Sequence, residues 1–290
     1  MLNLRKKPTK KRKKVSEIKI NIDNHEIVQG KKTTRVFQFE SVFQIREVLN
    51  NIEPNTRAKI LINYKLNKFY VFKTESSKKL DLEESELDTS EIATLIKSFY
   101  SEEEMQWDKQ FEKKPQKIKS EIAPAFFQIN DNYLVSENRY INVMYLEHLN
   151  HSLNVQDIIK NCWLSIECYK VDNDTILNKL MEMKKDKVID KKFSDFISDR
   201  IENIIYKLKQ EIIFQAEFNL LLYNTSLEEL NKYSLFIKET LRENGCISYT
   251  PNEKINTRKL FEKCIYPCKD MDVVHSIADK ELFKMIGCEN

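Results

Sequence analysis

Glycine is scarce in this sequence, which contains only Gly30, Gly245 and Gly287 among its 290 residues. A phosphate-binding loop needs several glycines, because its backbone amides must turn toward the phosphate oxygens without side chains in the way. Neither G-x-x-x-x-G-K-[ST] nor G-x-G-x-x-G occurs. These absences exclude an ordinary nucleotide-hydrolysing P-loop and the usual dinucleotide-binding fingerprint.

Other catalytic signatures are missing as well. The sequence has no G-x-S-x-G and no H-E-x-x-H, patterns that indicate serine hydrolases and zinc peptidases. Cys264 and His275 supply a thiol and an imidazole, but no nearby residue in the sequence activates the Cys264 thiolate. We therefore expect no catalytic residue, no cofactor and no enzymatic activity. An enzyme without a known signature stays open as an alternative.

Four aspartates lie close together in a polar region that is also rich in lysine. Paired carboxylates of this kind could hold the metal ions of a two-metal nuclease. Aspartates beside lysines are more often solvated helix faces with ion-pair partners. We favour this second interpretation for Asp186, Asp190, Asp195 and Asp199.

Cysteine and histidine are present, but not in a metal-binding pattern. Cys264-x-x-x-Cys268 has no second cysteine pair at the spacing of a zinc site, and His148-x-x-His151 has no evident ligand partner. Zinc sites usually show two such pairs. We therefore expect no bound metal.

Long apolar runs are also absent. No stretch of about 18 apolar residues exists, so we expect no transmembrane helix. The N-terminus has no apolar core segment of a secretory signal. These features favour a cytoplasmic protein in a reducing compartment, with free thiols at six positions. The cysteines are Cys162, Cys168, Cys246, Cys264, Cys268 and Cys288.

Positive charge is concentrated at the N-terminus, where residues 1–16 form a basic arm. Of the 48 basic residues, eight lie in this arm, which leaves 40 against 45 acidic residues, so the rest of the chain is mildly acidic. Such arms bind polyanions, either nucleic acid or an anionic membrane surface. A disordered, solubilising terminus is the alternative. The candidate polyanion-binding residues are Arg5, Lys6, Lys7, Lys10, Lys11, Arg12, Lys13 and Lys14.

Residues 193–249 carry the clearest structural pattern. Apolar residues at steps of three and four from Ile197 to Ile212 predict a helix, and alternation over 214–222 predicts a strand with one strongly buried face. Ser226 with Glu229 predicts a capping box at the start of a second helix. Gly245 is placed to end that helix with a positive φ, before a strand at 246–249. This order of elements indicates α/β layers rather than a helical bundle.

The whole chain is predicted to belong to the α+β class, with mixed α/β layers, sheets covered by helices and two subdomains. After the basic arm, residues 17–105 read as an N-terminal α+β subdomain. Residues 106–120 are charged and have little periodicity, so they read as a hinge. Residues 121–290 then form an α/β domain.

Shorter patterns predict the remaining elements. Strands are expected at 17–22, 35–40, 59–64, 68–72, 140–146 and 163–169, with a hairpin turn in which Asn67 is left-handed. Helices are expected at 43–52, from a Ser90 cap to about 104, within 148–161, from about 175, at 258–264 and at 277–286. Asp172 or Asn173 is expected to cap the helix that starts near 175.

Residues 118–290 contain an ordered series of segments that resembles a known family. The segments are I-A-P at 122–124, Y-I-N-V-M-Y-L at 140–146, L-S-I-E-C-Y-K-V-D at 164–172, I-F-Q-A-E-F-N-L-L-L-Y-N-T-S-L-E-E-L at 213–230, L-F-E-K-C-I-Y-P at 260–267 and H-S-I-A-D-K-E-L-F at 275–283. Their order resembles the N-terminal, non-motor region of the conjugation ATPases of type IV secretion systems, the TraE/TraC-type family. The usual proline after the strand at 140–146 is absent, with Asn150 near its place. The motor domain itself has no counterpart here, so no catalytic residue carries over.

The resemblance implies a non-catalytic docking component of a conjugative DNA-transfer apparatus. Its implied partners are inner-membrane subunits of the secretion channel and a P-loop motor protein, with self-association as a further possibility. A cytoplasmic position at the inner face of the cell membrane is implied too, where the basic arm could contact anionic lipid. The alternative is a nucleic-acid-binding accessory protein of a mobile element that grips phosphates with the same arm.

Overall fold

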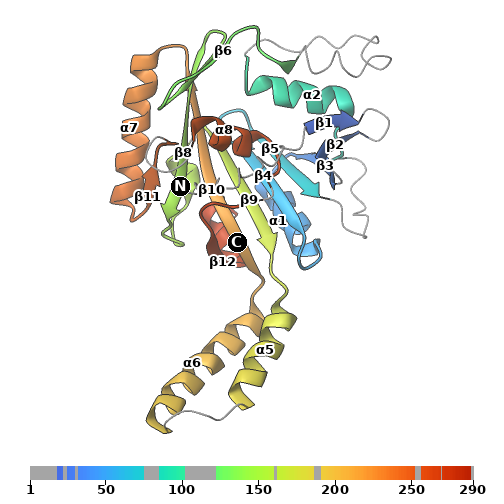
Figure 1. Cartoon of the computed structure of the whole chain (residues 1–290), viewed down its shortest axis with the longest axis vertical. Helices are drawn as coiled ribbons and strands as arrows, with labels where there is room; N and C mark the ends of the chain where they lie inside the picture. The colour runs from blue at the N-terminus through green and yellow to red at the C-terminus, as the bar shows by residue number, and fades with distance from the viewer. Residues whose placement is uncertain are drawn as a thin grey trace, which may run out of the picture.

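A computed structural model describes residues 18–21, 25–29, 32–74, 85–101, 122–159, 162–185, 191–251, 256–268 and 270–288. Within these residues, twelve strands form one sheet in which every pair is antiparallel, and helices cover it (Figure 1). The predicted α+β class is therefore confirmed. The basic arm and the predicted hinge at 106–120 lie outside the described residues.

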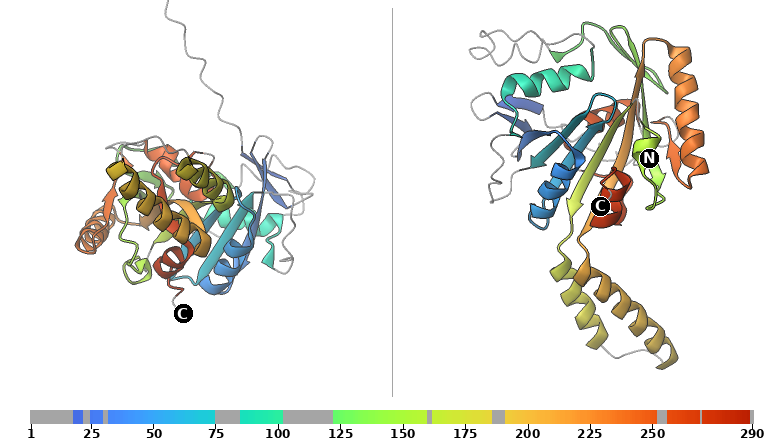
Figure 2. Two further views of the ribbon diagram at one scale, coloured as in Figure 1. Left: turned by 90° about the horizontal axis from the view of Figure 1, so that it is seen from below. Right: turned by 180° about the vertical axis from the view of Figure 1, so that it is seen from behind.

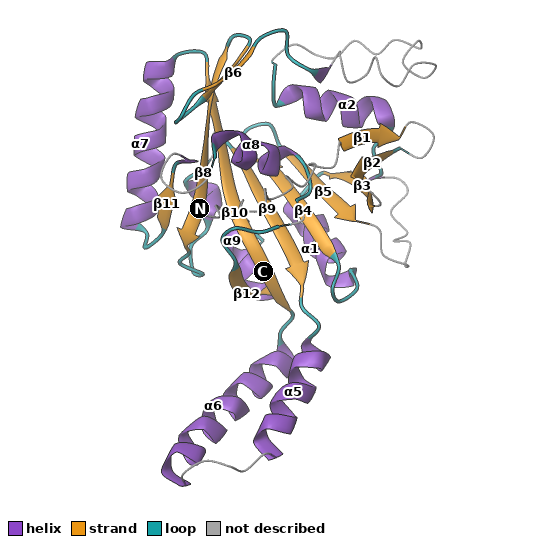
Figure 3. Cartoon of the chain, viewed as in Figure 1, coloured by secondary structure: helices purple, strands orange, loops and turns teal. Residues whose placement is uncertain are grey.

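Figure 3 colours the helices, strands and loops of the chain. The strands are β1 (Ile18–Asn21), β2 (Glu26–Gln29), β3 (Lys32–Phe39), β4 (Arg57–Asn63), β5 (Lys68–Thr74), β6 (Phe127–Ile129), β7 (Leu134–Ser136), β8 (Arg139–His148), β9 (Trp163–Lys170), β10 (Ile213–Asn224), β11 (Ile247–Tyr249) and β12 (His275–Ala278). The helices are α1 (Val42–Asn51), α2 (Thr89–Ser98), α5 (Asn173–Lys185), α6 (Lys191–Gln210), α7 (Leu227–Glu243), α8 (Thr257–Ile265) and α9 (Asp279–Met285).

The sheet joins the two halves of the sequence at its centre. Its order is β1-β2-β3-β5-β4-β9-β10-β8-β7-β6, with β11 on β8 and β12 on β10. The junction is the β4–β9 pair, where Ile60 lies opposite Ile166. Strands from 17–105 and from 121–290 therefore share one backbone ladder. The division into two subdomains stays a prediction.

Helices cover both faces of the sheet (Figure 2). On one face, α1, α7 and α9 contribute Ile45, Ile237 and Phe283 to a core that includes one side of β10. On the other face, α2 and α8 contribute Ile92 and Phe261 to a second core. Removing this apolar surface from water is the main stabilising contribution of such layers, at about 25 cal/mol per Å².

Strand β10 has the predicted alternation, but both of its faces are buried at the centre. Phe214, Phe218 and Leu222 have no exposed surface, as expected for the apolar side. On the opposite side, Glu217 is 2% exposed and Asn219 is 1% exposed. The expectation of a single strongly buried face was therefore incomplete, because α8 covers the side that carries the polar residues.

Helices α5 and α6 form an antiparallel hairpin that leaves the sheet between β9 and β10 (Figure 1). The strands close the base of the hairpin, where Val171 N donates to Ile213 O at 2.9 Å. Asn173 Nδ2 donates to Leu208 O and Glu211 O at 2.9 and 2.7 Å. Asp172, one of the two predicted caps, accepts from Thr175 N at 3.3 Å. These bonds fix the hairpin to the ends of the two central strands.

Helix α7 begins and ends close to the predicted residues. Ser226 Oγ accepts from Glu229 N at 3.4 Å. The expected return bond from Glu229 is replaced, because Ser226 N donates to Asn224 Oδ1 at 3.0 Å. After the helix, Gly245 has a φ of 78°, and its amide donates to Arg242 O at 3.0 Å. The predicted glycine C-terminus is confirmed.

Replacing Gly245 with alanine is expected to destabilise the fold by about 1 kcal/mol, because alanine adopts positive φ only at a cost. Space does not contribute, since an added Cβ would lie 3.6 Å from Asn150 Nδ2, an ordinary contact. Urea unfolding of the Gly245→Ala variant measures the loss. An unchanged midpoint would contradict the left-handed conformation.

Several helices begin or end at residues other than the predicted ones, for local reasons. Helix α2 is capped by Asp88, whose carboxylate accepts from Glu91 N at 2.8 Å, and not by Ser90; the helix ends at Ser98. The helix expected within 148–161 is a short 3-10 turn at Val155–Asp157. The last helix begins at Asp279, because the residues before it pair with β10 as β12. The predicted left-handed Asn67 is confirmed, with a φ of 51°.

Candidate functional site

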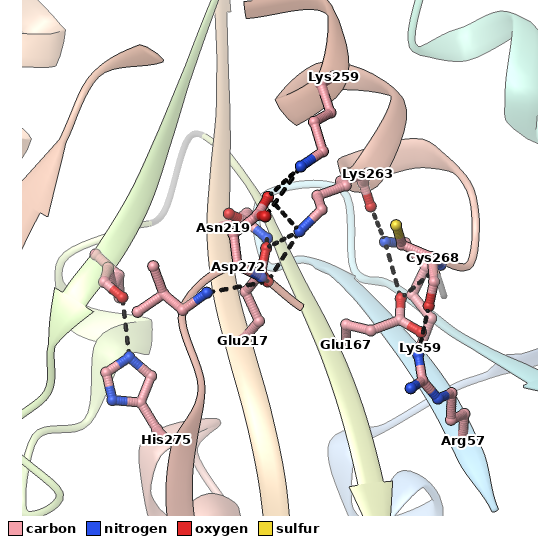
Figure 4. Close-up of polar contacts among 12 residues, drawn as sticks. Arg57, Lys59, Glu167, Glu217, Asn219, Lys259, Lys263, Cys268, Asp272 and His275 are labelled. Carbon is pink, nitrogen blue, oxygen red and sulfur yellow. Dashed lines mark hydrogen bonds and ion pairs between the residues drawn. The ribbon is translucent and has the colours of Figure 1, made fainter. Parts of the chain in front are cut away.

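A row of charged side chains crosses three central strands on the face beneath α8 (Figure 4). Lys59 on β4 lies opposite Glu167 on β9, and Glu167 lies opposite Glu217 on β10. Residues directly opposite one another point to the same face of a sheet. The three residues are 0%, 4% and 2% exposed, respectively. Buried charges are costly unless they are paired and hydrogen-bonded, so the partners of each group matter.

Glu217 is the well-compensated carboxylate of the row. Lys263 Nζ, from α8, lies 3.1 and 3.0 Å from its two oxygens. Asp272 N donates to Glu217 Oε2 at 2.5 Å, and Val273 N does so at 3.5 Å. Asn219 Nδ2 donates to the other oxygen at 3.1 Å. These donors offset much of the cost of burying the Glu217 carboxylate.

Glu167 has fewer partners. Its Oε2 accepts from Cys268 N at 3.2 Å and lies 3.7 Å from Lys59 Nζ. Burial raises the pKa of Glu167 to about 7, with Lys59 acting in the opposite direction. Lys59 Nζ is itself shared, because it also donates to the backbone carbonyl of Lys263. Glu167 is thus the less compensated of the two neighbouring carboxylates.

The network reaches solvent at Asp272. Its carboxylate lies 2.8 Å from Lys263 Nζ and 2.9 Å from the Nζ of the half-exposed Lys259. Burial alone would raise the pKa of Asp272, but hydrogen bonds from Lys263 and Lys259 outweigh it, so the pKa lies below its ordinary value. Partial burial lowers the pKa of Lys263, but Asp272 and Glu217 outweigh that effect and raise it. Asp272 and Lys263 therefore stay charged near neutral pH.

The same row holds the backbone that follows α8. Arg57 lies two residues before Lys59 on β4, and its Nη1 donates to Cys268 O at 3.0 Å. Together with the bonds to Cys268 N and Asp272 N, this contact ties the connection between α8 and β12 to the centre of the sheet. A carboxyl group with a pKa near neutrality can act as a general acid or base. Here Glu167 faces Lys59 and protein backbone, which favours a structural role.

Two strands carry a local signal for this network. Lys59 and Glu167 each stand inside an apolar strand, in A-K-I-L-I and S-I-E-C-Y. A charge in the middle of a buried strand implies a buried partner. The partner residues Lys263 and Asp272 come from α8 and from the segment after it, so their place could not be read from local pattern.

Cys264 and His275, considered above as a thiol and imidazole pair, contact different cores. Cys264 lies on the buried side of α8, and burial raises its pKa to about 12. The His275 ring packs against Phe218 on the other side of β10, with the ring centroids 6.0 Å apart. Its Nε2 lies 2.9 Å from Leu146 O. The geometry therefore does not bring the thiol and the imidazole together.

The other residues weighed for metal binding do not converge in the part of the chain that is described. His151 Nδ1 lies 3.0 Å from Glu281 Oε2, and no cluster of three or more histidine, cysteine or acidic side chains is found among the described residues. Asp186 and Asp190 lie outside them, and Asp195 and Asp199 belong to α6. Cys264 and Cys268 are free thiols, as are the other four cysteines.

No protein-family model and no curated protein matches this chain. Within the described residues, no helix has both the length and the apolar character needed to cross a membrane. The eight candidate polyanion-binding residues of the arm, Arg5 to Lys14, lie outside the described residues.

Proposed function

We propose that this chain is a non-catalytic docking component of a conjugative type IV secretion apparatus. The observation that carries the docking role is the α5–α6 hairpin, which leaves the central strands and exposes apolar side chains. The link to conjugation comes from the resemblance of residues 118–290 to the region that precedes the motor of TraE/TraC-type ATPases.

The apolar surface of the hairpin is wider than the contact between its two helices. Leu177 of α5 and Ile201 of α6 are 9% and 8% exposed, so they form the packed seam. Ile204 follows Ile201 by one helical turn and is 47% exposed, and Ile176 beside Leu177 is 36% exposed. Residues three or four apart share one side of a helix. The seam therefore continues onto a surface that a third helix could cover.

This arrangement suits an adaptor. A helix that lies in an apolar groove is a common mode of protein recognition. Because the hairpin is fixed at its base by Asn173 and by the Val171–Ile213 bond, a bound partner would take a defined orientation relative to the sheet. The resemblance implies that this partner is the P-loop motor protein, with inner-membrane subunits of the channel nearby. The proposed location is peripheral, at the inner face of the membrane.

The test is co-purification of the tagged protein from gently solubilised membranes of its native host. We expect Ile204→Asn to lower the recovery of the motor protein at least about tenfold, since removing a central apolar anchor commonly costs 1.4 kcal/mol or more. Leu235→Asn is the matched control, because Leu235 is exposed at 61% on α7, away from the hairpin. Recovery should be unchanged in that variant.

Two results would overturn the docking proposal. One is equal loss of the partner in both variants, and the other is recovery of nucleic acid alone. The second result would favour the nucleic-acid alternative, which predicts that log affinity falls by about 0.9 per phosphate contacted as log salt rises. Deleting residues 1–16 separates the two roles of the arm. Loss of membrane association supports lipid contact, worth about 1 kcal/mol per basic residue, and loss of DNA binding alone supports the alternative.

A further inference from the structure

Helix α7 stands at the outer edge of the molecule, with one side on the sheet and the other side open to solvent (Figures 1 and 2). Its inner side carries Leu230, Ile237 and Leu241, which have no exposed surface, and it packs against β8, β10 and β11. On its outer side, Leu235 is 61% exposed and Phe236 is 57% exposed. Two large neighbouring apolar side chains in water form a small patch that a protein surface could cover.

A stripe of five residues runs along this outer side and carries both signs of charge. Steps of four and three residues place its members on one line of the helix surface. Read from the N-terminal end, the charges are negative, positive, none, negative and positive. The two halves of the stripe therefore have opposite charges at matching distances from its centre. The five residues, all of them exposed, are Glu228, Lys232, Leu235, Glu239 and Arg242.

This order of charges is complementary to its own reverse. If two α7 helices lie antiparallel with Leu235 against Leu235, Glu228 of each copy meets Arg242 of the other. Lys232 of each copy then meets Glu239 of the other. In a parallel pair every charge would face its own sign, which is unfavourable. The stripe therefore selects a second α7 helix that runs in the opposite direction.

We propose that α7 is the contact between two copies of this chain, paired antiparallel across a two-fold axis at Leu235. Leu235 and Phe236 of both copies supply the apolar centre. The charges fix the orientation more than they add affinity, because they are exposed. Lys232 can exchange partners at little cost, since its contacts to Glu228 and Glu229 are exposed. One helix pair is a small interface, so the dissociation constant should be about 10–100 µM.

Sedimentation equilibrium of the purified full chain from about 1 to 200 µM tests the dimer. We expect the mass to rise from 34.6 kDa toward twice this value. Leu235→Asn should weaken the dimer at least about 30-fold, because both copies lose the central anchor. Ile204→Asn is the matched control on the hairpin and should leave the dimer intact. The two variants separate this contact from the proposed docking site, since Leu235→Asn is expected to retain the motor protein.

Two further sets of variants test the antiparallel register. Glu239→Lys places like charges opposite each other in both symmetric pairs and should weaken the dimer at least about fivefold. Adding Lys232→Glu should restore it, because the pairs then carry reversed but opposite charges. Glu228→Cys and Arg242→Cys should give a disulfide-linked dimer on oxidation only when the two proteins are mixed. All four positions are exposed, so these variants should fold.

The proposal fails on any of three results. One is a mass that stays at the monomer value over the whole concentration range. Another is a dimer that survives Leu235→Asn, and its loss in Ile204→Asn would assign self-association to the hairpin instead. The third is a disulfide-linked dimer formed by Glu228→Cys alone, which would show a parallel pair.

Discussion

Replacing residues 172–212 with an Asn-Gly turn is expected to leave the sheet folded and to abolish partner docking. The register allows this exchange, because β9 and β10 are neighbours and Lys170 lies opposite Phe214. Val171 N already donates to Ile213 O, so a two-residue type I′ turn can join the strands, and Asn-Gly is the preferred sequence for it. The new glycine takes the place of Ile212, whose carbonyl accepts from Asp279 N.

Urea unfolding and co-purification measure the two halves of this prediction. Helices α5 and α6 contact each other, and neither Leu177 nor Ile201 belongs to the two cores that flank the sheet. We therefore expect the unfolding free energy to change by no more than about 1 kcal/mol. The motor protein should be lost from the purified complex. A variant that fails to fold would show that the hairpin supports the core, and a variant that keeps its partner would place docking elsewhere.

Replacing Lys263 with methionine is expected to cost about 3–5 kcal/mol of unfolding free energy. The substitution keeps an apolar stem of similar length but leaves Glu217 buried without its cation, and Asp272 without its nearest one. Removing one partner of a buried ion pair is more harmful than removing both, because the remaining charge keeps its desolvation cost. Denaturant unfolding at neutral pH measures the loss.

A double variant and a surface control make this experiment selective. Lys263→Met combined with Glu217→Gln should be more stable than Lys263→Met alone, because the second change removes the unpaired charge. Lys232 is the matched surface lysine, with contacts to Glu228 and Glu229 at 2.8 and 3.1 Å in exposed positions. Lys232→Met should not change stability measurably. Equal losses at Lys263 and Lys232 would mean that the network is not buried in solution.

The fold could be predicted from the sequence where one element's own pattern decides its structure. The alternation of β10, the Ser226 start of α7 and the glycine at its end are local signals, and the structure has all three. Asp88 and Ser90 are both good caps, and local pattern could not choose between them. Asp88 caps the helix because its carboxylate accepts from Glu91 N while the Glu91 carboxylate accepts from Asp88 N.

The polar network could not be predicted, because it depends on contacts between distant segments. Glu217 alternates with apolar residues, which ordinarily indicates a solvated strand face. Its burial follows only once α8 brings Lys263 over the sheet. For the α5–α6 hairpin the prediction errs in the other direction, because a face expected to be buried is partly exposed. The apolar period of α6 predicts a core face, but the helix packs against α5, and Ile204 stays half-exposed.

The β4–β9 junction also determines the order in which the protein can be built. Ile60 of β4 pairs with Ile166 of β9, about 100 residues later in the chain. One edge of β4 therefore stays unpaired until β9 has been synthesised. Pairings between residues far apart in the chain slow folding, and unpaired strand edges invite association with other chains. A nascent chain of this protein is therefore a natural client for chaperones, and its first half alone is a poor choice for expression.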